Sequence, residues 1–479
     1  MEGRRAWVGL REWGPTFLLA LLPLLGWWAT GLTDLDEGFY GAVTAEMNRA
    51  HEWLIPLYNG HPWFEKPILL YWVAKPCLML FGKEFGPRLP SVLASMGLYV
   101  LVYRFVRRHV GIAASKWSVL ALSTSVLVAA LGRMMLVDPL FVMCLSGCMF
   151  CFWNSLTARA KWRVWAALWL GLAVLAKGPV ALVLFGFVAV LTYVLMPDTR
   201  PSFRGYWGLS VLVCLAVIAS WYVPAYLVSR DVFVQKFLIE QNLDRFSGGD
   251  TAHRVPWPIG IVYYVPVVAL GMLPWSVFLW KAWPRRSSDS SGLSGYLVLW
   301  ACVVIGLFTL SGSKLPHYVL PSFVPLAVVV GIYLARRSSA WRPWPAAAWA
   351  VGLCALANAG FWVAYDASYR DLREIASFVR QRSGAVSVYA MSREGSAGGL
   401  SLNETGHPSL LFYLDRDVSN PSSFSDLLAE PTPCWVITRS GRISSADRAL
   451  AAARGLRLDV EPVGRSSGSY ELDLLTAVR

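Results

Sequence analysis

Charged side chains that interrupt a very apolar sequence gather in five polar stretches of this chain. Burying charge in hydrocarbon is costly, so such residues indicate a functional site by default. Carboxylates and cations brought to one place suit proton transfer and the stabilisation of developing charge. The five stretches contain Asp36, Glu37, Tyr40, Glu65 and Lys66; Arg133 and Asp138; Lys177; Arg245; and Lys314, His317 and Tyr318.

The elements that must position these residues are helices long enough to cross a membrane. Of the 479 residues, 56% are hydrophobic and 15% are charged, and the mean hydropathy is +0.47. Ordinary soluble domains carry about 25% charged residues, and a span needs about 20 mostly apolar ones. The sequence therefore predicts a mostly α, polytopic helical bundle with spans over 13–32, 88–106, 112–132, 138–157, 162–177, 178–196, 206–228, 259–281, 294–312, 317–335 and 344–365.

The basic residues predict how these spans are oriented. The net charge of +13 does not indicate a nucleic-acid partner, because Lys and Arg cluster in alternate connections such as 104–108 and 336–342. Positive-inside sorting explains this pattern. It predicts a multi-pass protein of the inner (plasma) membrane with a cytoplasmic N-terminus and with the polar stretches and residues 366–479 outside. The apolar run 68–81 is too short to span and is predicted to lie at the interface.

Each polar residue also has a local explanation. Carboxylates at the start of a helix cap its free N–H groups, and lysines near its end reach toward lipid phosphates. Such explanations leave open why all the polar stretches share one side of the membrane. They apply to Asp36, Glu37 and Asp138 as caps, to Glu65 and Lys66 as an ion pair, and to Lys177 and Lys314 as lipid contacts.

The last part of the chain has a different pattern, in which charged helical patterns alternate with short strand-like runs. The sequence therefore predicts a transmembrane domain over 1–365 and a small soluble α/β domain over 366–479. The first outer loop of the transmembrane domain spans 33–87 and is expected to hold interfacial helices. The expected elements of the α/β domain are helices at 372–382 and 446–454 and strands at 386–390, 435–438 and 456–460.

Two motifs in the first outer loop resemble a known family. Residues 36–40 read Asp-Glu-Gly-Phe-Tyr and are followed by Glu46-Met47, and residues 59–67 read Asn-Gly-His-Pro-Trp-Phe-Glu-Lys-Pro. Both are similar to signatures of the protein-mannosyltransferase-like and aminoarabinose (lipid A) transferase-like membrane glycosyltransferases of the GT-C fold, although Phe39 stands where that family usually has Arg. Further matches follow in the family's order at 88–91, 177–178, 245–246, 273–275 and 313–321.

The resemblance implies a GT-C bundle of about 11–13 spans that moves a sugar from a polyprenyl-phosphate donor to an extracytoplasmic acceptor, with inversion. The acceptor would be lipid A, another envelope glycan or glycolipid, or a protein. By similarity, Asp36 is the general base, Asp138 is an acidic partner, and Glu65 is a metal ligand or holds the loop. The implied substrate-binding residues are Glu37, Tyr40, Lys66, Arg133, Lys177, Arg245, Lys314, His317 and Tyr318.

Two questions stay open at this point. A divalent metal ion, with Glu65 as a ligand, is one alternative, because the first loop offers oxygen ligands but no spacing that compels a metal. A lipid or solute transporter or flippase is the competing function, with a non-catalytic lipid-binding protein as a third. Transporters tend to have internal repeats and ionisable groups near the midplane, whereas here the charges lie at span ends. The expected partners are therefore the lipid-linked donor, a lipid or glycan acceptor and membrane lipids.

Overall fold

In the computed structural model, the chain forms two compact units that interleave along the sequence. The first consists of Met1–Trp27, Phe64–Val73 and Arg88–Asn358, and the second of Trp28–Trp63, Ala74–Pro87 and Ala359–Arg479. The expected domain division at residue 365 stays a prediction. The structure describes residues 13–33, 36–244, 255–283, 292–337, 344–368, 370–389, 408–421, 423–463 and 470–478.

The first unit is a bundle of apolar helices. Among the described helices, six are long and apolar enough to cross a membrane, or eight if each of two bent helix pairs forms one span. Helices satisfy their own backbone polar groups, as a lipid environment requires. The helices are α4 (Leu89–His109), α5 (Ile112–Ser123), α6 (Val126–Leu131), α7 (Val137–Thr157), α8 (Trp162–Lys177), α9 (Val180–Leu195), α10 (Trp207–Phe233), α12 (Trp257–Val262), α13 (Tyr264–Gly271), α14 (Leu279–Ala282), α15 (Leu293–Leu310), α16 (Leu320–Arg337) and α17 (Trp344–Ser368), which continues into the second unit.

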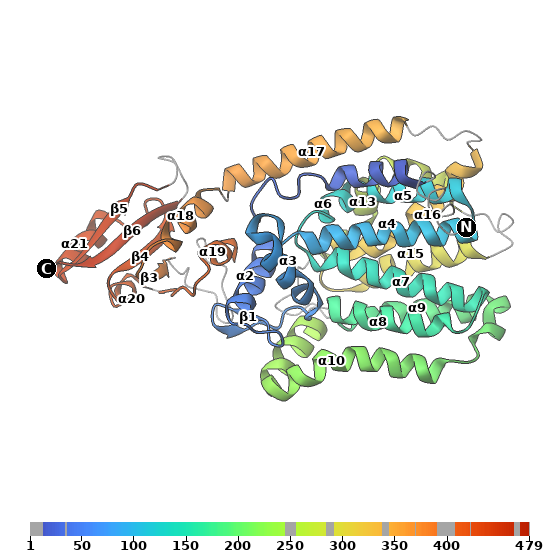
Figure 1. Ribbon diagram of the computed structural model, residues 1–479, viewed down its shortest axis with the longest axis horizontal. Coiled ribbons are helices and arrows are strands. Elements are labelled where there is room, and N and C mark those ends of the chain that lie inside the picture. The colour runs from blue at the N-terminus through green and yellow to red at the C-terminus, as the bar shows by residue number, and fades with distance from the viewer. Residues whose placement is uncertain are drawn as a thin grey trace. The chain divides into compact units, whose positions relative to one another are not determined.

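The bundle is built from neighbouring helices in close contact. α4 packs against α5 and α7, α16 packs against α5 and α15, and α8 packs against α7 and α10, as Figure 1 shows. Gly331 of α16 faces Ser118 of α5, where an added Cβ would collide, and Gly147 of α7 faces the ring of Trp169 of α8. Small residues at such contacts let helix backbones approach closely in a membrane.

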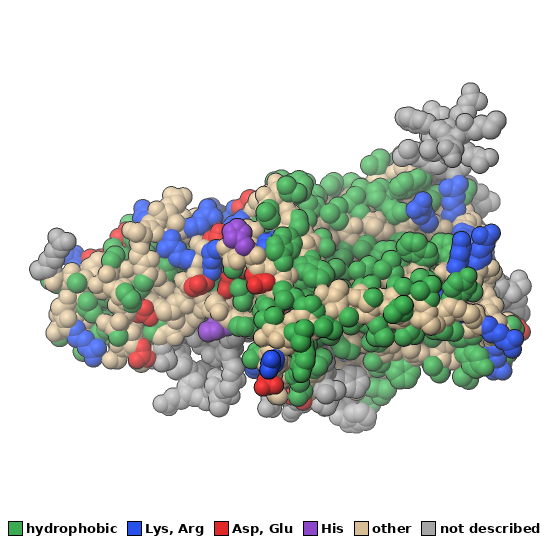
Figure 2. All heavy atoms as spheres, turned by 60° about the horizontal axis from the view of Figure 1, so that its bottom comes forward, with side chains coloured by type: hydrophobic (Ala, Val, Ile, Leu, Met, Phe, Trp, Pro, Cys, Tyr) green, Lys and Arg blue, Asp and Glu red, His purple; other side chains and the backbone are tan. Residues whose placement is uncertain are grey.

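The outer surface of the first unit is apolar. Leu212 and Leu227 on α10 are each 64% exposed, and Val265 on α13 is 68% exposed. Figure 2 shows hydrophobic side chains over much of the helical surface and Lys and Arg gathered at one end of the helices. Such a surface suits lipid rather than water, so the chain is a multi-pass membrane protein, as the sequence predicts.

One expected span, 112–132, is divided into α5 and α6. Thr124 lies at the break, where its Oγ1 accepts a hydrogen bond from Trp275 Nε1 at 2.9 Å and its carbonyl accepts one from Trp349 Nε1 at 2.8 Å. These bonds give hydrogen-bond donors to polar groups at the break, where the regular bonding of the helix is interrupted. The expected span 259–281 is likewise bent, by 106° between Pro258–Gly271 and Trp275–Ala282.

The second unit contains most of the loop 33–87, of which only Phe64–Val73 belong to the first unit. Asn59 and Gly60 form the turn of a short hairpin with φ angles of 50° and 80°, which are left-handed values that an Asn-Gly turn adopts readily. Glu46 accepts the N–H groups of these two residues at 2.6 and 2.8 Å. Burial raises the pKa of the Glu46 carboxyl despite these bonds. The elements of the loop are α2 (Asp36–Arg49), β1 (Leu57–Tyr58), β2 (His61–Pro62) and α3 (Leu69–Phe85), which is shared between the two units.

A four-stranded sheet forms the core of the C-terminal region. Its strand order is β3-β4-β6-β5, with β3 parallel to β4 and the other pairs antiparallel. The expected helices and strands of this region are present, and α19, α20 and β6 are additional. The elements are α18 (Arg370–Arg380), β3 (Ala385–Val388), α19 (Pro408–Leu414), α20 (Phe424–Leu427), β4 (Cys434–Arg439), α21 (Ser445–Ala453), β5 (Leu456–Glu461) and β6 (Tyr470–Ala477).

Hydrogen bonds join the first outer loop to the C-terminal region within the second unit. The hydroxyl of Tyr413 accepts the N–H of Leu32 at 2.7 Å. The side chain of Asn59 exchanges two hydrogen bonds with the backbone of Val418, at 3.0 and 2.9 Å, and α19 packs against α2. The helix that begins at Asp36 is therefore held by the C-terminal region.

Candidate active site

A buried ion pair joins the start of α7 to the end of α8. Lys177 Nζ pairs with Asp138 Oδ1, and their side chains are 9% and 4% exposed. α7 and α8 pack together and are connected by only a few residues, so these two ends meet. Each charge also complements its own helix dipole, because Asp138 lies in a first turn and Lys177 in a last one.

Three further predicted residues surround this pair. Lys66 and His317 are close enough for their charges to act on Asp138. Lys177 Nζ lies 5.1 Å from the centre of the Tyr318 ring, which in turn lies 5.0 Å from the ring of His317. We refer to Lys66, Asp138, Lys177, His317 and Tyr318 as the cationic cluster. The structure thus brings together residues from four of the five polar stretches.

The cationic cluster suits an anionic ligand. Asp138 balances the charge of Lys177, so Lys66 and any protonated His317 add positive charge. Cations and N–H donors held in a partly buried place bind phosphate oxygens more strongly than the same groups in water. The Lys66 ammonium also donates to the carbonyl of Glu65 at 3.2 Å, which turns it toward its own loop.

Lys314 has different contacts from the cluster lysines. Its side chain is 7% exposed, and burial lowers its pKa. An ammonium has three N–H donors, and here each has a backbone carbonyl within reach at the end of α15. The lysine therefore fixes the turn that precedes His317, and a direct contact with substrate stays a prediction. The three carbonyls belong to Phe308, Thr309 and Ser311, at 3.2, 2.9 and 2.6 Å.

Arg133 is tied to α17. Its side chain is 3% exposed, and its guanidinium donates to Asn358 Oδ1 at 2.8 Å. Asn358 Nδ2 donates in turn to the carbonyls of Leu25 and Cys354, at 3.1 and 2.8 Å. Asn358 was not predicted, although a polar amide within an apolar span is a signal that sequence analysis can use.

The surroundings of Glu65 do not fit a divalent cation. Hard cations take six or more oxygen ligands. Across the described ranges, no group of three or more His, Cys, Asp and Glu side chains could hold a metal ion. Lys66 follows Glu65 in the chain, and the charge of Glu65 acts on the buried phenol of Tyr71.

The predicted residues of the first motif lie on α2 in the second unit. Asp36 is exposed at the start of the helix, whereas Glu37 is 1% exposed and accepts the N–H and hydroxyl of Thr33 at 3.0 and 2.7 Å. Glu37 therefore ties the segment before the helix to its first turn. Tyr40 is 5% exposed, and its carbonyl accepts the hydroxyl of Thr44 at 2.7 Å.

Phe39, the departure from the family motif, belongs to an aromatic cluster one turn from Asp36. Its ring stacks on Trp63 with centroids 4.9 Å apart and lies 5.2 Å from the ring of Tyr58. Residues three apart share a helix face, so these rings lie on the side of α2 that carries Asp36. That Asp36 faces the cationic cluster stays a prediction, and Arg245 lies outside the described residues.

Similar proteins agree with this architecture. Residues 65–223 match the family model of dolichyl-phosphate-mannose-protein mannosyltransferase. The chain is 31% identical over 311 residues, 63% of its length, to the undecaprenyl phosphate-alpha-4-amino-4-deoxy-L-arabinose arabinosyl transferase of Edwardsiella ictaluri. It is also 31% identical over 349 residues, 69% of its length, to the undecaprenyl phosphate-alpha-4-amino-4-deoxy-L-arabinose arabinosyl transferase 1 of Pseudomonas fluorescens. The matched part spans only 55% and 61% of these two relatives.

The fold is similar to that of a solved structure along nearly the whole chain. The crystal structure of ArnT from Cupriavidus metallidurans bound to undecaprenyl phosphate has a TM-score of 0.75 at 20% identity and covers 98% of both chains. At this identity the likeness shows the fold. The GT-C fold expected from the motifs is thereby confirmed, as is the resemblance to the aminoarabinose transferase type.

Proposed function

We propose that this chain, which has the GT-C fold, transfers a sugar from a polyprenyl-phosphate donor to an acceptor on the non-cytoplasmic side of the membrane. The cationic cluster is the observation that carries the proposal. It places two lysines and a histidine around a buried carboxylate at one end of an apolar bundle. A lipid-linked phosphate can enter such a place while its tail stays among the helices.

In the proposed reaction, an acceptor hydroxyl attacks the anomeric carbon of the donor sugar. The bond from that carbon to the phosphate oxygen breaks, and its electron pair leaves with the phosphate. Lys66, Lys177 and His317 stabilise the charge that develops on the leaving oxygen. Asp138 holds Lys177 in place through their ion pair. One attack of this kind inverts the configuration at the anomeric carbon.

Asp36 takes the proton of the acceptor hydroxyl. Its carboxylate is exposed, so an acceptor can approach it, and it stands at a helix start whose orientation the neighbouring Glu37–Thr33 bonds fix. General-base catalysis of this kind contributes about 10²–10⁴-fold to a rate. The aromatic cluster of Phe39, Tyr58 and Trp63 offers an apolar surface beside this base.

The donor proposed first is the one that the relatives' names give, undecaprenyl phosphate-linked 4-amino-4-deoxy-L-arabinose. The acceptor proposed with it is lipid A or a similar envelope glycolipid. The orientation follows from the positive-inside pattern, with the N-terminus in the cytoplasm and the cationic cluster and C-terminal region outside. A divalent ion bound through Glu65 has no support from the surrounding side chains.

The test is sugar transfer in proteoliposomes that contain the full-length protein. A panel of polyprenyl-phosphate sugars is offered with an envelope glycolipid extract, and loss of each lipid-linked donor is followed. We expect one donor to be consumed by the wild type and by Asp459→Asn, a control at an exposed carboxylate of the same unit. Asp36→Asn should lower the rate at least about 100-fold.

Two results would overturn the proposal. Movement of the intact donor across the membrane, with no loss of sugar from it, would favour the flippase. Consumption of the donor by Asp36→Asn at the wild-type rate would remove Asp36 as the base. Donor binding by each variant, measured in parallel, separates lost chemistry from lost binding.

A further inference from the structure

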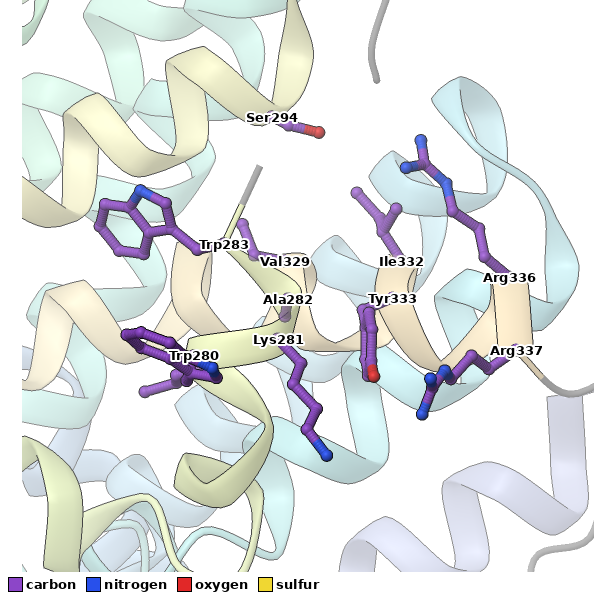
Figure 3. A pocket seen from close by; sticks show the side chains of 11 residues that line it. Trp280, Lys281, Ala282, Trp283, Ser294, Val329, Ile332, Tyr333, Arg336 and Arg337 are labelled. Atoms are coloured by element: carbon purple, nitrogen blue, oxygen red, sulfur yellow. The ribbon is translucent and has the colours of Figure 1, made fainter. Parts of the chain in front are cut away.

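A cavity lies between α14, α15 and α16 of the first unit. Its volume is about 810 Å³, within the range of small-molecule sites, about 300–1,000 Å³. Figure 3 shows Trp280 of α14 and Trp283, which directly follows this helix, on one side and two arginines of α16 on the other, with Ile332 and Tyr333 between them. The lining residues that the argument uses are Trp280, Lys281, Trp283, Tyr333, Arg336 and Arg337.

This cavity lies at the opposite end of α16 from the cationic cluster. α16 begins directly after the turn that carries His317 and ends at Arg337. Its 18 residues rise about 27 Å, close to the thickness of a bilayer's hydrocarbon core, about 30 Å. The cavity therefore opens at the other membrane interface, which the positive-inside pattern makes the cytoplasmic one.

The charge of the cavity is positive. Lys281, Arg336 and Arg337 are exposed at its edge. None of the described residues that line it is acidic. Arginine and lysine side chains placed together in this way suit the oxygens of a phosphate group.

The apolar part of the cavity faces lipid. Trp280 is 89% exposed and Trp283 is 51% exposed, and aromatic side chains of this kind lie at the level of lipid headgroups. The guanidinium of Arg337 lies 5.5 Å from the centre of the Tyr333 ring, which holds it beside the cavity. Val329 and Ile332 form a buried apolar floor. A soluble anion would use the cations alone, whereas a phospholipid would use both surfaces.

We propose that this cavity binds the phosphodiester headgroup of an anionic phospholipid of the cytoplasmic leaflet. The headgroup phosphate lies between Lys281, Arg336 and Arg337, and the acyl chains lie along the exposed side chains of Trp280 and Trp283. Basic pockets between membrane helices on this side suit such headgroups. The site is separate from the cationic cluster, so it does not depend on the proposed reaction.

The test is native mass spectrometry of the full-length protein released from detergent micelles with added phosphatidylglycerol or phosphatidylcholine. We expect the wild type to retain phosphatidylglycerol in preference. Lys281→Gln/Arg336→Gln/Arg337→Gln should weaken this binding roughly a hundredfold, because each of the three basic residues contributes about fivefold. Arg336→Lys/Arg337→Lys, which keeps the charge, should retain the preference.

The matched control removes three arginines from the last turns of α4, in Arg104→Gln/Arg107→Gln/Arg108→Gln. These arginines are exposed. The hydroxyl of Ser91, near the start of α4, donates to the carbonyl of Leu136, just before α7, at 3.1 Å, so α4 begins at the end of the bundle that holds Asp138. Its last turns therefore lie at the opposite end, as Arg336 and Arg337 of α16 do. The control should bind phosphatidylglycerol as the wild type does. An equal loss of phosphatidylglycerol binding in both triple variants would show that binding depends only on the general positive charge of this surface, and would overturn the proposal. So would displacement of the lipid by millimolar inorganic phosphate, or equal retention of phosphatidylcholine.

Discussion

Removing Lys177 alone should destabilise the protein more than removing Lys177 and Asp138 together. Their side chains are 9% and 4% exposed and form an ion pair. Lys177→Met leaves the carboxylate of Asp138 buried without its direct partner, and breaking a buried pair in this way costs about 3–5 kcal/mol. Because Lys66 and His317 also act on Asp138, we expect the lower end of this range.

The double variant Lys177→Met/Asp138→Asn removes both charges. It should therefore recover about 2 kcal/mol of the lost stability, since residues in contact couple by about 0.5–3 kcal/mol. Sugar transfer should not recover with it. Losing one group that stabilises developing charge costs about 10²–10³-fold in turnover, and the double variant still lacks the Lys177 ammonium.

The free energy of unfolding can be measured by titration with sodium dodecyl sulfate in mixed micelles, and turnover in proteoliposomes. The control is Lys236→Met/Glu240→Gln, because this pair is exposed by 55% and 26% and a surface pair contributes only about 0–1 kcal/mol. Wild-type stability of Lys177→Met would refute the argument from burial. Near wild-type transfer by the double variant would show that the pair serves structure alone.

Other variants probe the rest of the molecule. Tyr413→Phe leaves the N–H of Leu32 without its acceptor, so we expect a loss of about 1–3 kcal/mol, measured as faster hydrogen exchange over 36–49; unchanged exchange would contradict the role of this bond. Lys314→Met removes the donor to three carbonyls and should lower the unfolding temperature by several degrees, about 1–3 kcal/mol, with donor binding kept; loss of donor binding in a stable variant would instead assign Lys314 to the substrate. Burial raises the pKa of Asp473 from 3.8 to about 6 although Arg448 opposes it. A raised pKa means that the folded state holds the proton of Asp473 more tightly than the unfolded state does. Protonated Asp473 therefore adds up to roughly 3 kcal/mol to the free energy of unfolding. This stabilisation is fully present below about pH 4 and is lost as the pH rises through about 6. Asp473→Asn should flatten the pH dependence of hydrogen-exchange protection in β6, corrected for intrinsic rates, and an unaltered dependence would contradict the assignment.

Hydropathy predicted the long helices, because an uninterrupted apolar run of about 20 residues has few alternatives. It could not predict the break at Thr124, since the stabilising hydrogen bonds come from Trp275 and Trp349, far along the chain. β6 was missed for a different reason. Asp473 is fully buried in that strand, and a buried charge hides the alternation by which a strand is recognised.

The cationic cluster was foreseen only as a set of residues on one side of the membrane. Asp138 and Lys177 stand 39 residues apart, so their pairing depends on how α7 and α8 pack. Lys314 was grouped with the substrate-binding lysines, although a lysine just after a helix can bond to its last carbonyls. Glu37 was considered as a cap of its own helix, but it accepts hydrogen bonds from Thr33, which precedes the helix, and Asp36 is left exposed.

The most direct test is to determine the structure of the full-length protein in a lipid nanodisc with undecaprenyl phosphate. We expect the phosphate to contact Lys66 and Lys177, with His317 beside it and the polyprenyl tail along the helices. A phosphate bound elsewhere, for example between α14 and α16, with no ligand in the cationic cluster, would contradict the proposed donor site.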